Sequence, residues 1–263
     1  MKSDTSQTKS AVDSESYSSE DGLLVLQNLT KRFGGLVAVS DLSFHVEEGE
    51  ILGFIGPNGA GKSTTFNCVT KMFPATEGTV WYDGENITDL PAHEIVNRGI
   101  SRTFQSFRPL NDRTVLENVM LPLSTDKLFT VSGLLGQTQD RAIELCERVG
   151  LNDRIDQEPS ELPHAEMIRL ELARALANDP DLILIDEPFA GLTSTEVAEL
   201  SQLFSELRDE GYTLVVIDHN MRGLLTLVDR VIVIRFGAKI AEGTPEEIRE
   251  NEEVQNAYLG SQG

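Results

Sequence analysis

Residues 56–63 read Gly-Pro-Asn-Gly-Ala-Gly-Lys-Ser. This stretch has the spacing G-x-x-x-x-G-K-[ST], the P-loop pattern that holds nucleotide phosphates. A strand-like apolar run, residues 51–55, precedes it, and we expect a helix from about Lys62 to Phe73 after it. A glycine-rich turn whose backbone N–H groups point inward, followed by a helix N-terminus, is the setting that an anion requires. The stretch therefore predicts an α/β nucleotide-binding fold.

The residue types of this loop suit different parts of a magnesium nucleotide. Lys62 places an ammonium beside the β- and γ-phosphates, and Ser63 offers a hydroxyl to Mg²⁺. Gly59 and Gly61 allow a close approach of the backbone, and Thr64 lies in the first helical turn, within reach of the α-phosphate. The predicted phosphate-binding residues are Gly56, Pro57, Asn58, Gly59, Ala60, Gly61, Lys62, Ser63 and Thr64.

Polar residues also follow two later apolar runs. Asp186 and Glu187 come directly after residues 182–185, and His219 follows residues 214–217 with one residue between. Ligands of open α/β sheets bind at the carboxyl ends of the strands, so we expect these groups beside the phosphates. Asp186 suits a water-mediated Mg²⁺ ligand, Glu187 a base that polarises water, and His219 a contact to the γ-phosphate. Without the P-loop, each would read as an ordinary loop or structural residue.

The chain divides into three kinds of segment. Residues 1–20 are rich in Ser, Asp and Glu and predict a disordered acidic tail, and residues 21–263 form one domain. Three strand-like runs predict a partly antiparallel sheet: 23–26, 42–46 and 79–82. Helical spacing from about 106 to 176 predicts a helical insertion. Beyond it, apolar runs alternate with helices, which is typical of a mostly parallel sheet covered on both faces.

Composition limits the possible partners and environments. The net charge is −21, from 43 acidic and 22 basic residues, so the surface repels phosphates and we expect no nucleic-acid partner. Acidic residues are spread along the whole chain, which suggests the hypothesis of a halophilic protein in a salt-rich cytoplasm. Cys68 and Cys146 lie among apolar residues and are expected to be reduced and buried. With no apolar run of about 18 residues and no signal segment, we expect a cytosolic protein that can dock on a membrane protein.

From about Leu23 to Gly260 the chain resembles the ATP-binding subunits of ABC transporters, and most of all those that power uptake of branched-chain amino acids. The stretches that carry the closer likeness are Lys31-Arg32-Phe33-Gly34-Gly35-Leu36, Arg102-Thr103-Phe104-Gln105, Leu170 to Leu176, Ala190-Gly191-Leu192, Gly243 to Ile248 and Ala257-Tyr258-Leu259-Gly260. The ATP-binding subunits of related amide and urea importers share much of this sequence.

The resemblance implies an ABC ATPase fold and ATP hydrolysis coupled to transmembrane transport, with ATP and Mg²⁺ as cofactors. It implies a second ABC ATPase subunit, transmembrane permease subunits and, indirectly, a solute-binding protein as partners, at the cytoplasmic face of the cell membrane. Phe33 matches the aromatic residue that stacks on adenine, and Gln105 the loop glutamine that contacts Mg²⁺ and senses the transporter. Glu187 matches the general base, and His219 the switch histidine.

One segment departs from the family. The signature Leu-Ser-Gly-Gly-Gln, which caps the γ-phosphate of the opposite subunit, aligns with Leu162-Pro163-His164-Ala165-Glu166. Pro163 has neither a hydroxyl nor an N–H, although close relatives also tend to carry proline there. Glu166, if ionised near the γ-phosphate, would oppose it. These changes suggest that the site completed by this signature is slow or non-hydrolytic, and that the working partner is a different ATPase subunit.

Two other interpretations remain open on the sequence. A soluble ABC ATPase of an assembly or repair pathway shares the same motifs, although the acidic charge disfavours the repair version. A regulatory subunit that binds ATP without turnover fits the altered signature but not the intact Glu187 and His219.

The charge imbalance predicts a strong dependence of stability on salt. Raising KCl from low to molar concentration screens the repulsion among 43 acidic side chains and should raise the midpoint of thermal unfolding. Each recovered kcal/mol corresponds to about 2–4 °C in a chain of this size. Differential scanning calorimetry across a KCl series measures the shift, and a flat response contradicts the halophilic hypothesis.

Overall fold

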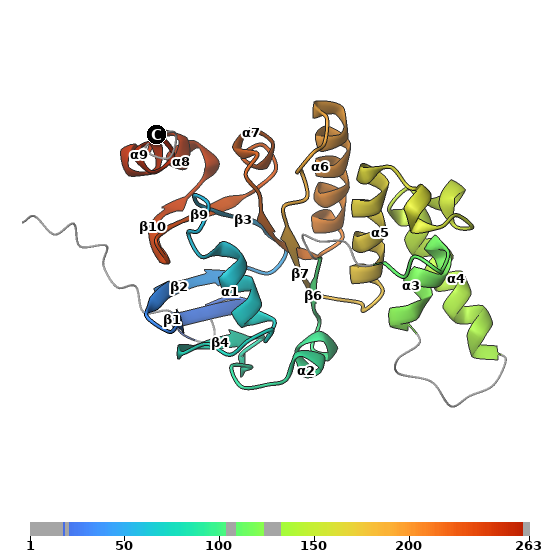
Figure 1. Ribbon diagram of the computed structural model, residues 1–263, viewed down its shortest axis with the longest axis horizontal. Coiled ribbons are helices and arrows are strands. Elements are labelled where there is room, and N and C mark those ends of the chain that lie inside the picture. The colour runs from blue at the N-terminus through green and yellow to red at the C-terminus, as the bar shows by residue number, and fades with distance from the viewer. Residues whose placement is uncertain (1–17, 19–20, 104–108, 124–132, 260–263) are drawn as a thin grey trace, which may run out of the picture.

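The computed structural model describes residues 18, 21–103, 109–123 and 133–259. The centre of the structure is a six-stranded sheet in the order β10-β9-β3-β8-β7-β6 (Figure 1). Its strands are β3 (Ile51–Ile55), β6 (Ile100–Arg102), β7 (Leu182–Asp186), β8 (Thr213–Ile217), β9 (Arg230–Arg235) and β10 (Ala238–Gly243). All neighbours are parallel except β10, which pairs antiparallel with β9. The predicted mostly parallel sheet is confirmed.

A second, antiparallel sheet has four strands in the order β2-β1-β4-β5. They are β1 (Leu24–Phe33), β2 (Leu36–Val46), β4 (Glu77–Tyr82) and β5 (Glu85–Asn86). The three predicted strands are found here, but β1 and β2 extend much further than their apolar runs and meet in a tight hairpin at residues 33–36. This hairpin carries Phe33 to the end of the sheet.

Helices cover both sheets. They are α1 (Lys62–Val69), α2 (Ala92–Asn97), α3 (Val115–Leu123), α4 (Gly133–Arg148), α5 (His164–Leu176), α6 (Ser194–Asp209), α7 (Met221–Leu224), α8 (Pro245–Glu250) and α9 (Glu252–Leu259). In Figure 1, α3 and α4 lie beyond α5, on the side away from the antiparallel sheet. All three helices fall within the predicted helical insertion of about residues 106–176. That this insertion forms a separate subdomain stays a prediction. The predicted acidic tail lies outside the described residues, apart from Ser18.

The first helix is shorter than expected, and the prediction that it reaches Phe73 was wrong. It ends at Val69, with Lys71 in the left-handed region at φ +55°. The N–H of Lys71 donates to Cys68 O (3.2 Å), and the N–H of Met72 donates to Asn67 O (2.9 Å). This pair of bonds is a Schellman helix end, which usually places glycine where Lys71 stands. Because lysine stands in place of the usual glycine, no residue type in the sequence indicated this helix end.

Alternation along β3 divides the core between the two faces of the large sheet. Ile51 and Ile55 pack with the cluster beneath α5 and α6, whereas Leu52 and Phe54 pack with α1 and the antiparallel sheet. The predicted buried face of α6 is confirmed, since Val197, Leu200, Leu203, Phe204 and Leu207 are all buried. Across the described part of the chain, no helix combines the length and apolarity needed to cross a bilayer.

Phe54 joins three elements in this core. Its ring lies 5.3 Å from that of Phe44 on β2 and 6.3 Å from that of Phe66 on α1, measured between centroids. Its side chain is fully buried. Phe54 therefore couples the antiparallel sheet to the helix that follows the P-loop.

Truncation of Phe54 should be severe. Phe54→Ala is expected to lower the free energy of unfolding by about 3–5 kcal/mol, through lost transfer energy and a cavity. Phe236→Ala is the matched control, because Phe236 is 80% exposed and should change stability by less than about 0.5 kcal/mol. Urea unfolding followed by circular dichroism measures both, and equal losses would contradict this picture of the core.

Candidate nucleotide-binding site

The P-loop connects the central strand β3 to α1, as the sequence predicts. Gly61 is the residue before the helix, with φ +109°, and a Cβ there would lie 2.5 Å from Ala38 O on β2. Glycine is thus required by both the backbone conformation and the approach of the neighbouring strand. The loop is closed by a bond from Ala60 N–H to Pro57 O (3.1 Å), and Thr65 donates through both N–H and hydroxyl to Gly61 O.

Lys62 is buried and folds back over the loop that precedes it. Its Nζ donates to Gly56 O (2.6 Å) and Pro57 O (3.1 Å). Burial lowers the pKa of Lys62, while the carboxylates of Glu187, Asp186 and Asp218 act in the opposite direction. Two carbonyl bonds are weak compensation for a buried ammonium, so a phosphate anion would be a better partner.

The edge of the sheet next to the P-loop carries the two predicted acidic residues. Glu187 has φ +55°, and its N–H donates to Ile217 O (2.7 Å) at the end of β8. This unusual conformation for a non-glycine residue brings Glu187 Oε1 within 2.8 Å of His219 Nε2. The carboxylates of Asp186 and Glu187 lie close enough to Lys62 to act on its pKa, which they raise. The structure therefore brings the two acids, the histidine and the lysine to one place.

Asp218 supports this arrangement, although we assigned it no role from the sequence. Its Oδ2 accepts from Phe189 N–H (2.7 Å), and its Oδ1 accepts from Asn220 N–H (2.6 Å). Burial raises the pKa of Asp218, and the two N–H donors oppose the rise. The carboxylate ties the loop after Glu187 to the loop that bears His219. In the sequence, the position of Asp218 directly before His219 was the one feature that could have indicated this role.

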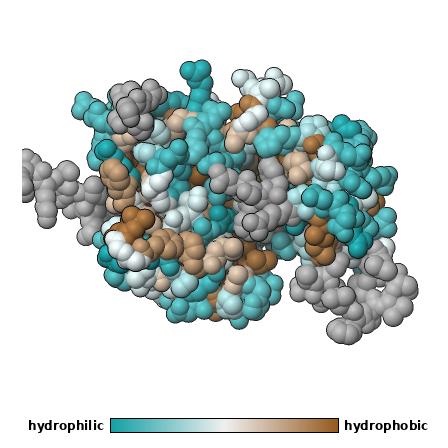
Figure 2. Space-filling model, in the orientation of Figure 1, coloured by the Kyte–Doolittle hydropathy of each residue, from teal (hydrophilic) through white to brown (hydrophobic). Residues whose placement is uncertain are grey.

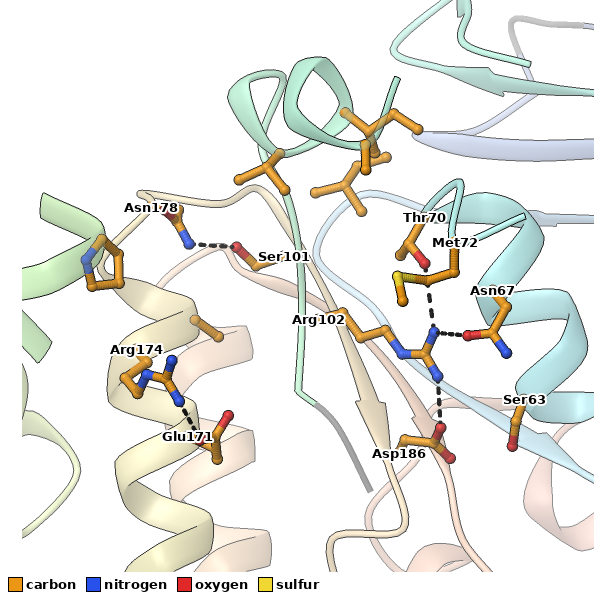
Figure 3. Close-up of a pocket in the computed structure, with 16 residues that line it drawn as sticks. Ser63, Asn67, Thr70, Met72, Ser101, Arg102, Glu171, Arg174, Asn178 and Asp186 are labelled. Atoms are coloured by element: carbon orange, nitrogen blue, oxygen red, sulfur yellow. Dashed lines mark hydrogen bonds and ion pairs between the residues drawn. The ribbon is translucent and has the colours of Figure 1, made fainter. Parts of the chain in front are cut away.

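Asp186 is held by a second residue to which sequence analysis gave no function. Arg102, at the end of β6, donates from Nη2 to Asp186 Oδ2 (2.9 Å) and from Nη1 to Asn67 Oδ1 (2.6 Å). Figure 3 shows the guanidinium between α1 and the end of β7, with Ser63 close to the same carboxylate. Burial raises the pKa of Asp186, and Arg102 opposes the rise. The side chains of the pair are 8% and 2% exposed.

These residues suit a Mg²⁺ ion that shares its ligands with a nucleotide better than a metal whose ligands all come from the protein. Among the described residues, no group of three or more His, Cys, Asp or Glu could hold a metal by itself. Mg²⁺ usually takes one or two protein ligands, with the remainder supplied by water and substrate phosphates. Asp186 Oδ1 is buried without a hydrogen-bond partner in the described part of the chain, and Ser63 adds a hydroxyl. This oxygen set suits Mg²⁺ held together with a nucleotide.

Phe33 lies at the β1–β2 hairpin and is not a core residue. It is 45% exposed, and its ring meets that of Phe73 edge-on at 5.2 Å between centroids. The Nζ of Lys31 lies 4.9 Å from the Phe33 centroid and donates to Pro74 O (2.6 Å). An aromatic ring fixed on one side and partly exposed is suited to stacking on a base. Gln105, the other residue assigned from resemblance, lies outside the described residues.

The altered signature stands at the start of α5. Leu162 is buried, Pro163 is the N-cap, and His164 Nε2 lies 2.9 Å from Ala190 O in the loop after Glu187. Ala165 follows in the first turn. Glu166 is engaged by Arg154, which donates from Nε (2.9 Å) and Nη2 (3.2 Å) to its two carboxylate oxygens. The sequence did not suggest this partner, which counters the negative charge that we expected to oppose a phosphate.

Comparison with known proteins identifies the family. Residues 39–190 match the protein family described as "ABC transporter". The chain belongs to that family. Membership makes it an ATP-binding cassette ATPase, which confirms the predicted family, fold and class of activity. Residues 238–263 also match the family "Branched-chain amino acid ATP-binding cassette transporter".

Individual ABC relatives cover nearly the whole chain. The high-affinity branched-chain amino acid transport ATP-binding protein LivG of Salmonella typhimurium is 39% identical, over 90% of this chain and 98% of its own length. The lipopolysaccharide export system ATP-binding protein LptB of Escherichia coli is 38% identical, over 90% of this chain and 97% of its own. A solved ABC cassette in its ADP conformation has 30% identity and a TM-score of 0.80, covering 90% of this chain and 98% of that one.

Proposed function

We propose that this chain is the ATP-hydrolysing subunit of an ABC importer for branched-chain amino acids. The observation that carries the enzymatic part is the contact of Glu187 with His219, 2.8 Å apart, at the sheet edge that also holds Lys62 and Asp186. The choice of substrate is supported by the match of residues 238–263 and by the likeness to LivG. LptB, a protein of an export system, is 38% identical, so import is inferred from residues 238–263 and from LivG and not from membership of the ABC family alone.

In this proposal the nucleotide is bound by three groups of residues. Phe33 stacks on adenine, and stacking of this kind is worth about 1–3 kcal/mol on nucleic-acid bases. Residues 56–64 surround the phosphates, with Lys62 as the main cation. Ser63, Asp186 and Gln105 would hold Mg²⁺, which when bound offsets phosphate charge.

Hydrolysis depends on Glu187. A carboxylate beside the γ-phosphate polarises the attacking water and accepts its proton. His219 Nε2 lies 2.8 Å from Glu187 Oε1, and in this proposal the same imidazole lies beside the γ-phosphate of the bound nucleotide. The strained backbone at Glu187 is consistent with such a role, because residues in rare conformations cluster at functional sites.

The membrane partner would dock where the surface is hollowed between α1, α2 and α5. A cavity of about 720 Å³ opens there. Met72, Val96 and Pro122 are among its apolar lining residues, and polar residues, including Ser63 and Asp186 of the proposed Mg²⁺ site, also line it. Met72 is 59% exposed, and the face seen in Figure 2 carries apolar areas in brown among the teal hydrophilic ones. Met72 and Val96 are exposed apolar side chains on an acidic protein, and such side chains suit contact with a permease segment. In this proposal the permease holds the chain at the cytoplasmic face of the cell membrane.

Neutralising the proposed base tests the enzymatic assignment. Glu187→Gln should reduce ATP turnover by about 10²–10⁴-fold, the usual contribution of general acid–base catalysis, and should leave nucleotide affinity intact. An ATP-bound dimer should accumulate, detected by light scattering, while phosphate release is measured in parallel. Glu253→Gln on the exposed face of α9 makes the same charge change as a control. Wild-type turnover in Glu187→Gln would show that the base is another residue.

We further propose that the signature of this chain completes a slow site and that its working partner is a different ATPase subunit. Pro163 offers neither a hydroxyl nor an N–H, and His164 and Ala165 replace the two glycines of the usual signature. A partner subunit with an ordinary signature would complete the other site of the dimer. A dimer of the type seen in a solved relative bound to ADP and phosphate (31% identity, TM-score 0.75) would bring such segments to the nucleotide.

Restoring the usual signature tests this second proposal. Replacing residues 163–166 with Ser-Gly-Gly-Gln should raise the turnover of the isolated chain by at least about tenfold, because single donors to developing charge are worth 10²–10³ in other enzymes. Glu166→Gln alone, which removes the charge but restores no donor at 163, should give a smaller gain. Unchanged turnover in the fourfold variant would contradict the idea that the signature limits hydrolysis.

A further inference from the structure

Arg102 makes more contacts than the neutralisation of the Asp186 charge alone would require. Arg102 contacts two elements besides its own strand. Its Nη1 donates to Asn67 Oδ1 (2.6 Å), and its guanidinium lies 5.5 Å from the Phe66 ring centroid, both on α1. Its Nη2 donates to Asp186 Oδ2 at the end of β7. The planar guanidinium is therefore fixed in both position and orientation.

Strand register explains why Arg102 can reach Asp186. β6 and β7 are parallel, with Arg102 paired to Leu184. Side chains two residues apart on a strand share a face, so Asp186 projects on the side of Leu184, toward α1. Asp186 lies two residues beyond Leu184 on β7, and the long arginine side chain spans this distance. The N–H of Thr103 donates to Leu184 O (3.0 Å), which continues the pairing and fixes the end of β6.

The two oxygens of Asp186 are in different situations. Oδ2 is taken by Arg102, whereas Oδ1 is buried and has no hydrogen-bond partner among the described residues. A buried carboxylate oxygen without a donor is costly unless a ligand completes it. Ser63, at the start of α1, lines the same cavity as Asp186, and Figure 3 draws both side chains there. The free oxygen and the Ser63 hydroxyl thus belong to one site.

We propose that Arg102 is a positioning residue for the Mg²⁺ site: by holding Oδ2 of Asp186 it directs Oδ1 toward the metal or its bound water. This inference rests on the proposed function, since it assumes that Mg²⁺ enters with a nucleotide. Outer residues that orient a metal ligand typically change metal affinity by about 10–100-fold when removed. In the opposite role, Arg102 is a cation that competes with Mg²⁺ for Asp186. The two roles predict effects of opposite sign.

The test is the affinity for a fluorescent ADP analogue, measured by anisotropy in EDTA and in a Mg²⁺ series. ADP is chosen because no hydrolysis enters the readout. For Arg102→Gln we expect an unchanged Kd in EDTA and a half-saturating Mg²⁺ concentration raised by about 10–100-fold. Arg102→Lys keeps the charge and a partner for Asp186 but loses the planar fork, so it should show a smaller rise in the same direction. If Arg102→Gln fails to fold, the Mg²⁺ dependence of Arg102→Lys still tests the proposal.

Arg98→Gln is the matched control, because it removes the same charge four residues earlier from a surface pair with Glu85 and Glu94. It should leave the Mg²⁺ dependence unchanged. A fall in the half-saturating Mg²⁺ concentration of the Arg102 variants would establish the competing role and overturn the proposal, as would no change in either variant. If the wild-type chain itself binds no ADP, the proposed function fails instead, so the two failures can be told apart.

Discussion

The whole candidate site depends on the alignment of three parallel strand ends. Pairing of Asp186 with Ile217 places the loops after β7 and β8 at the same level, and β3 brings the P-loop to the other side of β8. Glu187 and His219 then meet because each lies one or two residues beyond this common level. A slip of one residue in β7 would turn Asp186 to the opposite face of the sheet. Every residue of β7 and β8 is buried, so this slip would force closely packed side chains to repack on both faces of the sheet.

Charge at this edge is balanced in a way that favours a metal-bound nucleotide. Three carboxylates, those of Asp186, Glu187 and Asp218, face the cations of Lys62 and Arg102. A bare triphosphate would add further negative charge to a region that is already short of cations, in a chain whose net charge is −21. A phosphate chain that arrives with Mg²⁺ brings its own compensation. The electrostatics thus agree with the oxygen ligands in indicating Mg²⁺ together with the nucleotide.

The sequence was most informative where one residue type is required by local physics. The P-loop glycines, the apolar strand β7 and the buried face of α6 follow from backbone conformation and periodicity, and the structure has them where expected. The end of α1 was missed because Lys71 occupies a position that usually needs glycine. β6 was missed because three residues are too few for a periodic pattern. Without β6 there is no reason to place Arg102 beside Asp186, 84 residues away in the chain.

The pairing of Arg154 with Glu166 changes how the altered signature should be understood. From the sequence, Glu166 is a negative charge facing a phosphate, which would make the dimer site repulsive. In the folded chain its two oxygens accept from one guanidinium, so the pair presents little net charge. Repulsion is then a weaker cause of slow turnover than the missing donors at Pro163. Because proline lacks both N–H and hydroxyl, replacing the acid alone cannot supply what a γ-phosphate needs.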